Sequence, residues 1–185
     1  MIKGILRATV LLPLITSLVF PQHQAGGGIV YGDEIAVLVS APNGWVLDNI
    51  SGRSQGLHAV FYPVDSSWSK SDAVMYVDIA KLANGQNIMQ FIEDDVQRFR
   101  KRFSNLNVEA QSNLFTLNAQ KVEVRHFTGD EWGNHECVGY AKYKRSVAIY
   151  VLSARNAREF KAALPAFNKL ITESVLSEVK FKEKN

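Results

Sequence analysis

VAIYVL, residues Val147–Leu152, is the most informative segment of this sequence for the fold. All six side chains are aliphatic or aromatic. Successive residues of a β-strand point to opposite faces of the sheet, so a strand built from this stretch is apolar on both faces. Such a strand is stable only where both faces are covered. The sequence therefore predicts a sheet with this strand at its centre.

Other segments around this stretch also show the composition of strands. They are rich in β-branched and aromatic residues and are bounded by turn residues such as Pro42-Asn43-Gly44. The expected strands are residues 34–40, 45–47, 57–62, 72–79, 108–117, 120–128, 135–144 and 146–153. The chain thus alternates groups of strands with the two helical segments described next.

Residues 88–103 and 157–176 carry apolar side chains at helical spacing. Asn87 and Asn156 are suitable N-caps for these helices. Pro165 lies inside the second segment, where it either kinks the helix or opens a second helical segment. The first helix has the apolar stripe Ile88, Phe91, Ile92, Val96, Phe99 and Phe103. Two amphipathic helices each need a surface to cover, which indicates an α+β fold with a mainly antiparallel sheet.

The order of these elements resembles the PsbP-like superfamily, named for an extrinsic photosystem subunit of plants and cyanobacteria. The turn Ala41-Pro42-Asn43-Gly44-Trp45 is similar to a P-x-G-W-like turn of that family, and the helix Asn87 to Phe103 precedes a quartet of strands. The segment Ile171-Thr172-Glu173-Ser174-Val175 then closes the last helix. The resemblance spans residues 34–181. It implies an α/β/α sandwich and a binding or assembly role without catalysis, and it carries over no binding residue.

The N-terminus has the pattern of a secretory signal peptide. Lys3 and Arg7 precede the apolar run Ala8 to Phe20, which is too short for a membrane-spanning helix. We expect a signal peptide over residues 1–25, with cleavage after Ala25 and after Gly27 both possible. An uncleaved N-terminal anchor remains the alternative. A signal peptide would place the protein in the periplasm or outside the cell.

The rest of the chain is expected to form one domain over residues 29–181, with a frayed tail over residues 182–185. Gly26-Gly27-Gly28 is interpreted as a spacer, because it lacks the Lys-Ser/Thr that follows a phosphate-binding loop. Without Lys3 and Arg7, 19 basic residues face 18 acidic ones. A nearly neutral chain offers no electrostatic basis for nucleic-acid or anionic-membrane binding, and we expect no membrane span after the signal is removed.

Trp68 and Trp132 are the best candidates for contact with a partner. Each lies in a polar loop, where a large apolar side chain often serves as a binding anchor. Tyr62 and His135 are close to them in sequence and are candidates too. The alternative is that each tryptophan folds back over the core. The expected partner is an unknown protein or small ligand, and no cofactor is expected.

His135-Glu136-Cys137 is the one cluster with metal-ligand residue types. On a strand, His135 and Cys137 point to one face and Glu136 to the other. Zinc sites need three or four ligands, so the alternative is a half-exposed histidine beside a packed thiol. No catalytic residue or metal ligand is assigned. The leading hypothesis is a non-catalytic binding or assembly module; the alternative is a small metal-dependent or hydrolytic periplasmic enzyme centred on His135.

Overall fold

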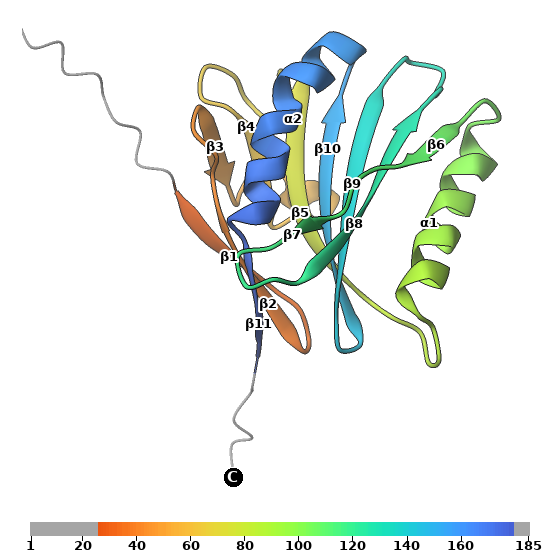
Figure 1. Ribbon diagram of the computed structural model, residues 1–185. Helices are drawn as coiled ribbons and strands as arrows, with labels where there is room; N and C mark the ends of the chain where they lie inside the picture. Colours follow the sequence, from red (N-terminus) through yellow and green to blue (C-terminus); the bar gives the residue numbers. More distant parts are fainter. Residues whose placement is uncertain (1–25, 180–185) are drawn as a thin grey trace, which may run out of the picture.

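The computed structural model describes residues 26–179, which form two antiparallel sheets and two long helices (Figure 1). The fold class is α+β, as expected. The predicted signal peptide, residues 1–25, and the predicted tail, residues 182–185, lie outside the described residues. No helix among residues 26–179 has the length and apolar character needed to cross a membrane.

The large sheet has eight strands in the order β3-β4-β5-β10-β9-β8-β6, and β7 also pairs with β8. Every pairing in it is antiparallel. Its strands are β3 (Trp45–Asp48), β4 (Ala59–Pro63), β5 (Ala73–Lys81), β6 (Asn107–Ala110), β7 (Leu114–Phe115), β8 (Lys121–Thr128), β9 (His135–Tyr143) and β10 (Ser146–Ala154).

The small sheet is also antiparallel and has the order β1-β2-β11. Its strands are β1 (Gly27–Tyr31), β2 (Ile35–Ser40) and β11 (Val175–Glu178). The helices are α1 (Ile88–Arg102) and α2 (Ala157–Thr172), and a single 3₁₀ turn, η1, spans Arg53–Gln55.

β10 lies at the centre of the large sheet, as the VAIYVL stretch predicts. All nine of its residues pair with β5 on one side and with β9 on the other. Tyr150 and Leu152 belong to one hydrophobic cluster, whereas Val147 and Val151 belong to a second cluster. Side chains of β10 point alternately to the two faces of the sheet, so this one strand contributes residues to two cores on opposite faces.

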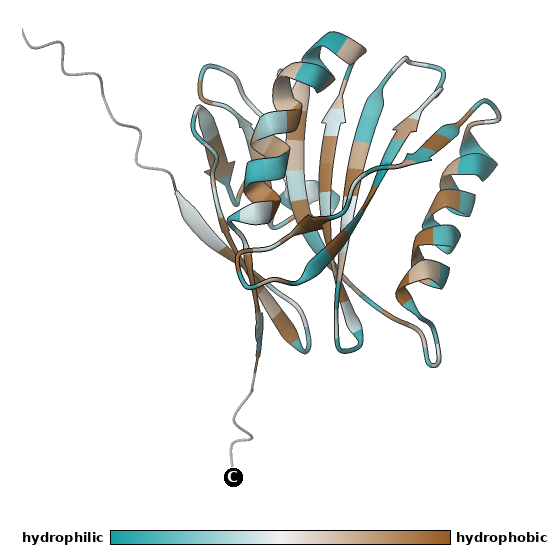
Figure 2. Ribbon diagram, viewed as in Figure 1, coloured by the Kyte–Doolittle hydropathy of each residue, from teal (hydrophilic) through white to brown (hydrophobic). Residues whose placement is uncertain are grey.

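Each core is closed by a different helix. Phe160 and Phe167 of α2 pack into the first core together with residues of the small sheet. Phe91 and Ile92 of α1 pack into the second core. The two helices therefore cover opposite faces of the large sheet. Figure 2 shows the apolar residues concentrated along the strands between them.

Both helices begin where their caps predict. The Asn87 side chain accepts a hydrogen bond from the Gln90 backbone, and the Gln90 side chain accepts one from the Asn87 backbone, a complete capping box. The Asn156 side chain accepts from the backbone N–H groups of Arg158 and Glu159. Pro165 lies within one helix, so it opens no second helical segment.

Three elements differ from the sequence-based expectation. The last helix ends at Thr172 rather than at residue 176, and Val175–Glu178 forms strand β11. The expected strand 108–117 is split into β6 and β7. Gly27 and Gly28, interpreted as part of a spacer, belong to β1, two residues before the expected start of the domain at residue 29.

Tertiary contacts explain the early end of α2. The Ser174 hydroxyl is buried, donates to the Ile171 carbonyl and lies 2.7 Å from the Tyr150 hydroxyl. The Asn118 side chain donates to the Leu176 carbonyl at 2.8 Å and accepts from the Leu176 N–H at 3.3 Å. These groups lie far apart in sequence, so periodicity alone could not reveal them.

Replacing Phe167 with alanine tests the core beneath α2. The Phe167 side chain is fully buried, so Phe167→Ala should lower the free energy of unfolding by about 3–5 kcal/mol. Phe115→Ala is the control, because Phe115 is 54% exposed and its loss should change stability little. Urea unfolding followed by circular dichroism measures both variants. Equal losses in the two variants would contradict this assignment of the core.

Candidate functional site

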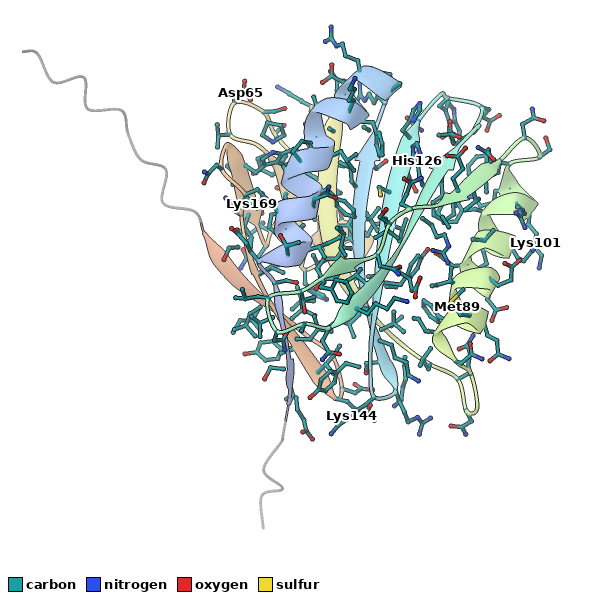
Figure 3. All side chains as sticks on the ribbon, viewed as in Figure 1. Asp65, Met89, Lys101, His126, Lys144 and Lys169 are labelled. Carbon is teal, nitrogen blue, oxygen red and sulfur yellow. The ribbon has the colours of Figure 1, made fainter. Side chains whose placement is uncertain are left out.

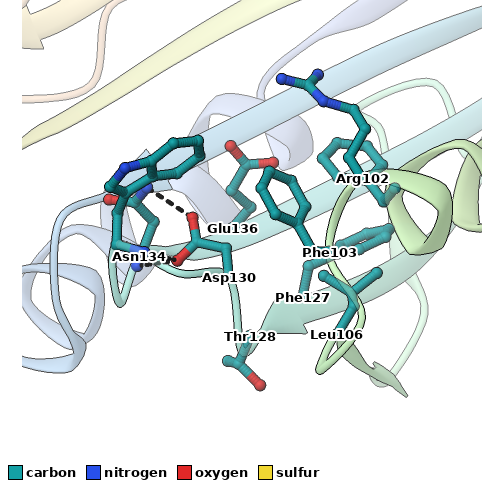
Figure 4. Close-up of a pocket in the computed structure, with 10 residues that line it drawn as sticks. Arg102, Phe103, Leu106, Phe127, Thr128, Asp130, Asn134 and Glu136 are labelled. Atoms are coloured by element: carbon teal, nitrogen blue, oxygen red, sulfur yellow. Dashed lines mark hydrogen bonds between the residues drawn. The ribbon is translucent and has the colours of Figure 1, made fainter.

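The turn between β8 and β9 and the C-terminal end of α1 enclose a cavity of about 150 Å³ (Figure 4). We call it the Trp132 pocket. Its lining combines aromatic and aliphatic side chains with a few polar groups. The lining residues are Phe99, Arg102, Phe103, Leu106, Phe127, Thr128, Asp130, Trp132, Asn134 and Glu136.

The turn that carries Trp132 is held by the carboxylate of Asp130. This carboxylate accepts hydrogen bonds from the backbone N–H groups of Trp132 and Asn134 and from the Asn134 side-chain amide, the last two at 2.8 and 2.7 Å. Gly129 and Gly133 adopt positive φ angles of 89° and 74°, which glycine accommodates without steric strain. The local sequence thus builds a defined turn that presents Trp132.

Trp132 is 63% exposed although it is the largest side chain of the turn. Its ring meets the ring of Phe103 edge-on, with 5.5 Å between centroids. The indole therefore rests against one wall of the pocket without being buried in the core. The sequence assigned Phe103 to the core stripe of α1; the structure instead places it half-buried at the pocket, just past the last residue of the helix.

Besides Asp130, which holds the turn, the pocket has two charged residues, Glu136 and Arg102 (Figure 4). Burial raises the pKa of the Glu136 carboxyl, which accepts a hydrogen bond from the Ser153 hydroxyl at 3.1 Å. The guanidinium of Arg102 lies 5.4 Å from the centre of the Phe103 ring. Within residues 26–179, no carboxylate forms a salt bridge with Arg102. The pocket can therefore offer a hydrogen-bonding carboxyl group and, beside its aromatic wall, a cation that forms no salt bridge.

Trp68 and Tyr62 lie away from this pocket. Trp68 is half-buried in the loop between β4 and β5, which also carries Asp65, labelled in Figure 3. This loop and the β8–β9 turn occur at the same end of the large sheet (Figure 1). The Tyr62 hydroxyl donates to the Asp48 carboxylate at 2.9 Å. Despite some burial, hydrogen bonds from Ser51, Ile50 and Tyr62 lower the pKa of Asp48 to about 2.

His135 lies on the opposite face of β9 from Glu136, under α2. Its Nδ1 atom is 3.2 Å from Nε2 of His126 on β8, which is labelled in Figure 3. The His126 ring stacks on Phe160 of α2, with 4.4 Å between centroids. Sequence reasoning missed His126, although pairing strand 120–128 with strand 135–144 places it directly opposite Cys137.

Cys137 is a packed thiol, as the alternative interpretation of the cluster holds. It is 2% exposed, and burial raises its pKa to about 12. Among residues 26–179, no three histidine, cysteine, aspartate or glutamate side chains gather closely enough to hold a metal ion. The described residues therefore offer two neighbouring imidazoles under α2 and no larger ligand set.

The histidine pair should make stability depend on pH. Burial, followed by the charge of His135, lowers the pKa of His126 below its ordinary value of 6.5, and Glu109 on β6 acts weakly in the opposite direction. A histidine with a lowered folded-state pKa stabilises the fold above its ordinary pKa, and this contribution is lost as the pH falls. The urea midpoint should therefore fall between about pH 7.5 and about pH 5.5, and His126→Gln should reduce that fall. His58→Gln, at an exposed position, is the control; an unchanged fall in His126→Gln would contradict the assignment.

No protein-family model matches this chain, and no curated protein matches it. Several solved structures do match it. The solution structure of cyanobacterial PsbP (CyanoP) from Synechocystis sp. PCC 6803 is 15% identical, with a TM-score of 0.52, and the match covers 88% of this chain and 99% of that chain.

A second similar structure is the Ran-binding protein Mog1p of Saccharomyces cerevisiae. It is 11% identical with a TM-score of 0.44, over 80% of this chain and 89% of that chain. At these identities the likeness concerns the fold alone. The order of strands and helices, the two helix-covered faces and the match to cyanobacterial PsbP agree with the resemblance noted in the sequence: the chain has a PsbP-like fold.

Proposed function

We propose that this protein is an exported, non-catalytic binding module that recognises a partner protein through the Trp132 pocket. The observation that carries the proposal is the 63% exposure of Trp132 on a turn fixed by Asp130. Tryptophan and arginine are enriched among the residues that dominate protein–protein binding energy. A rigid turn lowers the entropy cost of presenting such a residue.

The size of the pocket favours a protein partner over a small ligand. Its volume of about 150 Å³ is below the roughly 300–1,000 Å³ of most small-molecule sites. A space of this size suits one apolar side chain inserted by a partner. Phe99, Phe103 and Phe127 would surround that side chain, and Arg102 would face a carboxylate next to it.

The other three candidates stay predictions. Trp68 would extend the contact surface across the same end of the sheet, together with Tyr62. His135 lies beneath α2, on the opposite face of the large sheet from the Trp132 pocket. A partner that contacts His135 would therefore bind at a second place, on the α2 face. The alternative of a metal-dependent or hydrolytic enzyme centred on His135 draws support only from the proximity of His126, and we propose a non-enzymatic role.

Export and the layered architecture complete the proposal. The basic start and short apolar run of residues 1–25 support a signal peptide and a periplasmic or secreted location. The positions of α1 and α2 on opposite faces of the large sheet support the α/β/α sandwich that the resemblance implies. A single domain, predicted from the sequence over residues 29–181, is part of the same proposal, with β1 extending it back to Gly27.

Site-specific photocrosslinking tests the contact. A photoreactive phenylalanine analogue replaces Trp132 in the full chain, expressed in its own host. The matched control carries the analogue at Leu117, an apolar residue of the turn between β7 and β8 that is 70% exposed and lies outside the pocket. We expect one protein to crosslink through position 132 and not through position 117. Absence of a crosslink at 132, or the same products at both positions, would contradict the proposal.

The affinity for that crosslinked protein then gives a quantitative prediction. Trp132→Ala should weaken binding by at least about 2 kcal/mol, or roughly 30-fold, as measured with the purified partner by calorimetry. Leu117→Ala should leave the affinity unchanged. If both variants bind like the unmodified protein, Trp132 is not an anchor and the proposal is wrong.

A further inference from the structure

β1 is an edge strand of the small sheet, with a partner on one side only. The Ala41 N–H donates to the Gly26 carbonyl, and the Gly32 N–H donates to the Ile35 carbonyl. In an antiparallel pair, hydrogen-bonded and non-hydrogen-bonded residues alternate. The even-numbered residues of β1 therefore bond to β2, and the N–H and C=O groups of Gly27, Ile29 and Tyr31 point to the open edge.

A groove of about 380 Å³ runs along this open edge. Consecutive residues of β1 line it, which indicates the edge of the strand rather than one of its faces. β3, the edge strand of the large sheet, forms part of the opposite wall with η1 and the start of β4. The lining residues are Gly27, Gly28, Ile29, Tyr31, Leu47, Asn49, Arg53, His58 and Ala59.

Gly27 and Gly28, at the start of β1, have no side chains. This part of the groove is therefore narrow, and the backbone of β1 is accessible along it. A Cβ atom at Gly28 would lie 2.9 Å from a methyl group of Leu47, so glycine lets the Leu47 side chain of β3 lie directly against the backbone of β1. Glycine in a strand often marks a place where another backbone approaches closely. The Gly26-Gly27-Gly28 motif thus has a structural role that its interpretation as a spacer did not include.

Apart from a tyrosine, the ionisable side chains that line the groove are basic. Arg53 and His58 line it, and no aspartate or glutamate does. The nearby Asp48 carboxylate does not line the groove, and both of its oxygens accept hydrogen bonds, from Ile50, Ser51 and Tyr62. Arg53 donates through Nε to the Asn49 carbonyl, and no carboxylate within residues 26–179 forms a salt bridge with it.

We propose that an extended acidic segment of a partner protein adds to β1 as a further strand. The backbone groups of Gly27, Ile29 and Tyr31 would supply the ladder of hydrogen bonds, and Arg53 and His58 would pair with carboxylates of the segment. The chain's own ends lack the matching charge: residues 1–25 contain no Asp or Glu, and residues 180–185 carry three lysines and one glutamate. The groove shares no residue with the Trp132 pocket, so this site is separate from the one proposed above.

Selection from a library of random linear dodecapeptides tests the charge requirement. We expect enrichment of acidic, β-branched sequences, and Arg53→Glu should weaken binding of the selected peptides by at least ~10-fold, or about 1.4 kcal/mol. Lys161→Glu makes the same charge change at an exposed position of α2 outside the groove and should leave binding unchanged. Trp132→Ala should also have no effect, which separates this site from the Trp132 pocket.

Amide hydrogen exchange tests strand addition itself. In the free protein, the amides of Ile29 and Tyr31 should exchange rapidly, whereas those of Gly28 and Val30 are already protected by β2. A bound peptide should protect Ile29 and Tyr31. Ile29→Pro removes an N–H that β2 does not use, so it should abolish binding and leave the fold intact, while Ile29→Ala should retain binding.

Three results would overturn the proposal. The first is a library that yields no acidic binder, and the second is a set of peptides that bind equally to Arg53→Glu. The third is protection of Ile29 and Tyr31 that grows with protein concentration without peptide, because a second copy of this chain would then be the occupant.

Discussion

The burial of β10 is the constraint on which the rest of the structure depends. The N–H and C=O groups of its backbone are all hydrogen-bonded only when β5 and β9 pair with it along its whole length. Its apolar side chains are shielded from water only when both faces of the sheet are covered. Neither helix could meet that need alone. α2 covers one face through Phe160 and Phe167, and α1 covers the other through Phe91 and Ile92. The turns and loops that carry the candidate sites are connections required by this arrangement.

A pair of buried hydroxyl groups links the central strand to the small sheet. The Tyr150 hydroxyl of β10 lies 2.7 Å from the hydroxyl of Ser174, the residue just before β11, and both side chains are fully buried. A buried hydroxyl without a partner is costly, so each group fixes the position of the other. Asn118 then holds Leu176 through both backbone groups. This network ends the helix and directs the chain into the strand that completes the small sheet.

The two-residue period of β9 also separates the sites. Glu136 points toward α1 and becomes a wall of the Trp132 pocket, while His135 points toward α2 and meets His126. A cluster of three adjacent residues in sequence is therefore divided between two faces of the sheet. The same geometry brings Phe103, at the end of α1, against Trp132, in a turn 29 residues later in the sequence. The pocket is thus a product of the packing of α1 on the sheet, and only its turn is local.

Local chemistry explains the features that the sequence predicts correctly. An apolar run specifies the central strand, asparagine caps specify where both helices begin, and Asp130 with two glycines specifies the turn that exposes Trp132. Each of these depends on residues a few positions apart. The end of α2, the addition of β1 and β11 to a second sheet, the His126–His135 pair and the groove between two edge strands were decided by the tertiary structure alone. They arise from contacts between residues distant in sequence, which form only once the two cores have packed.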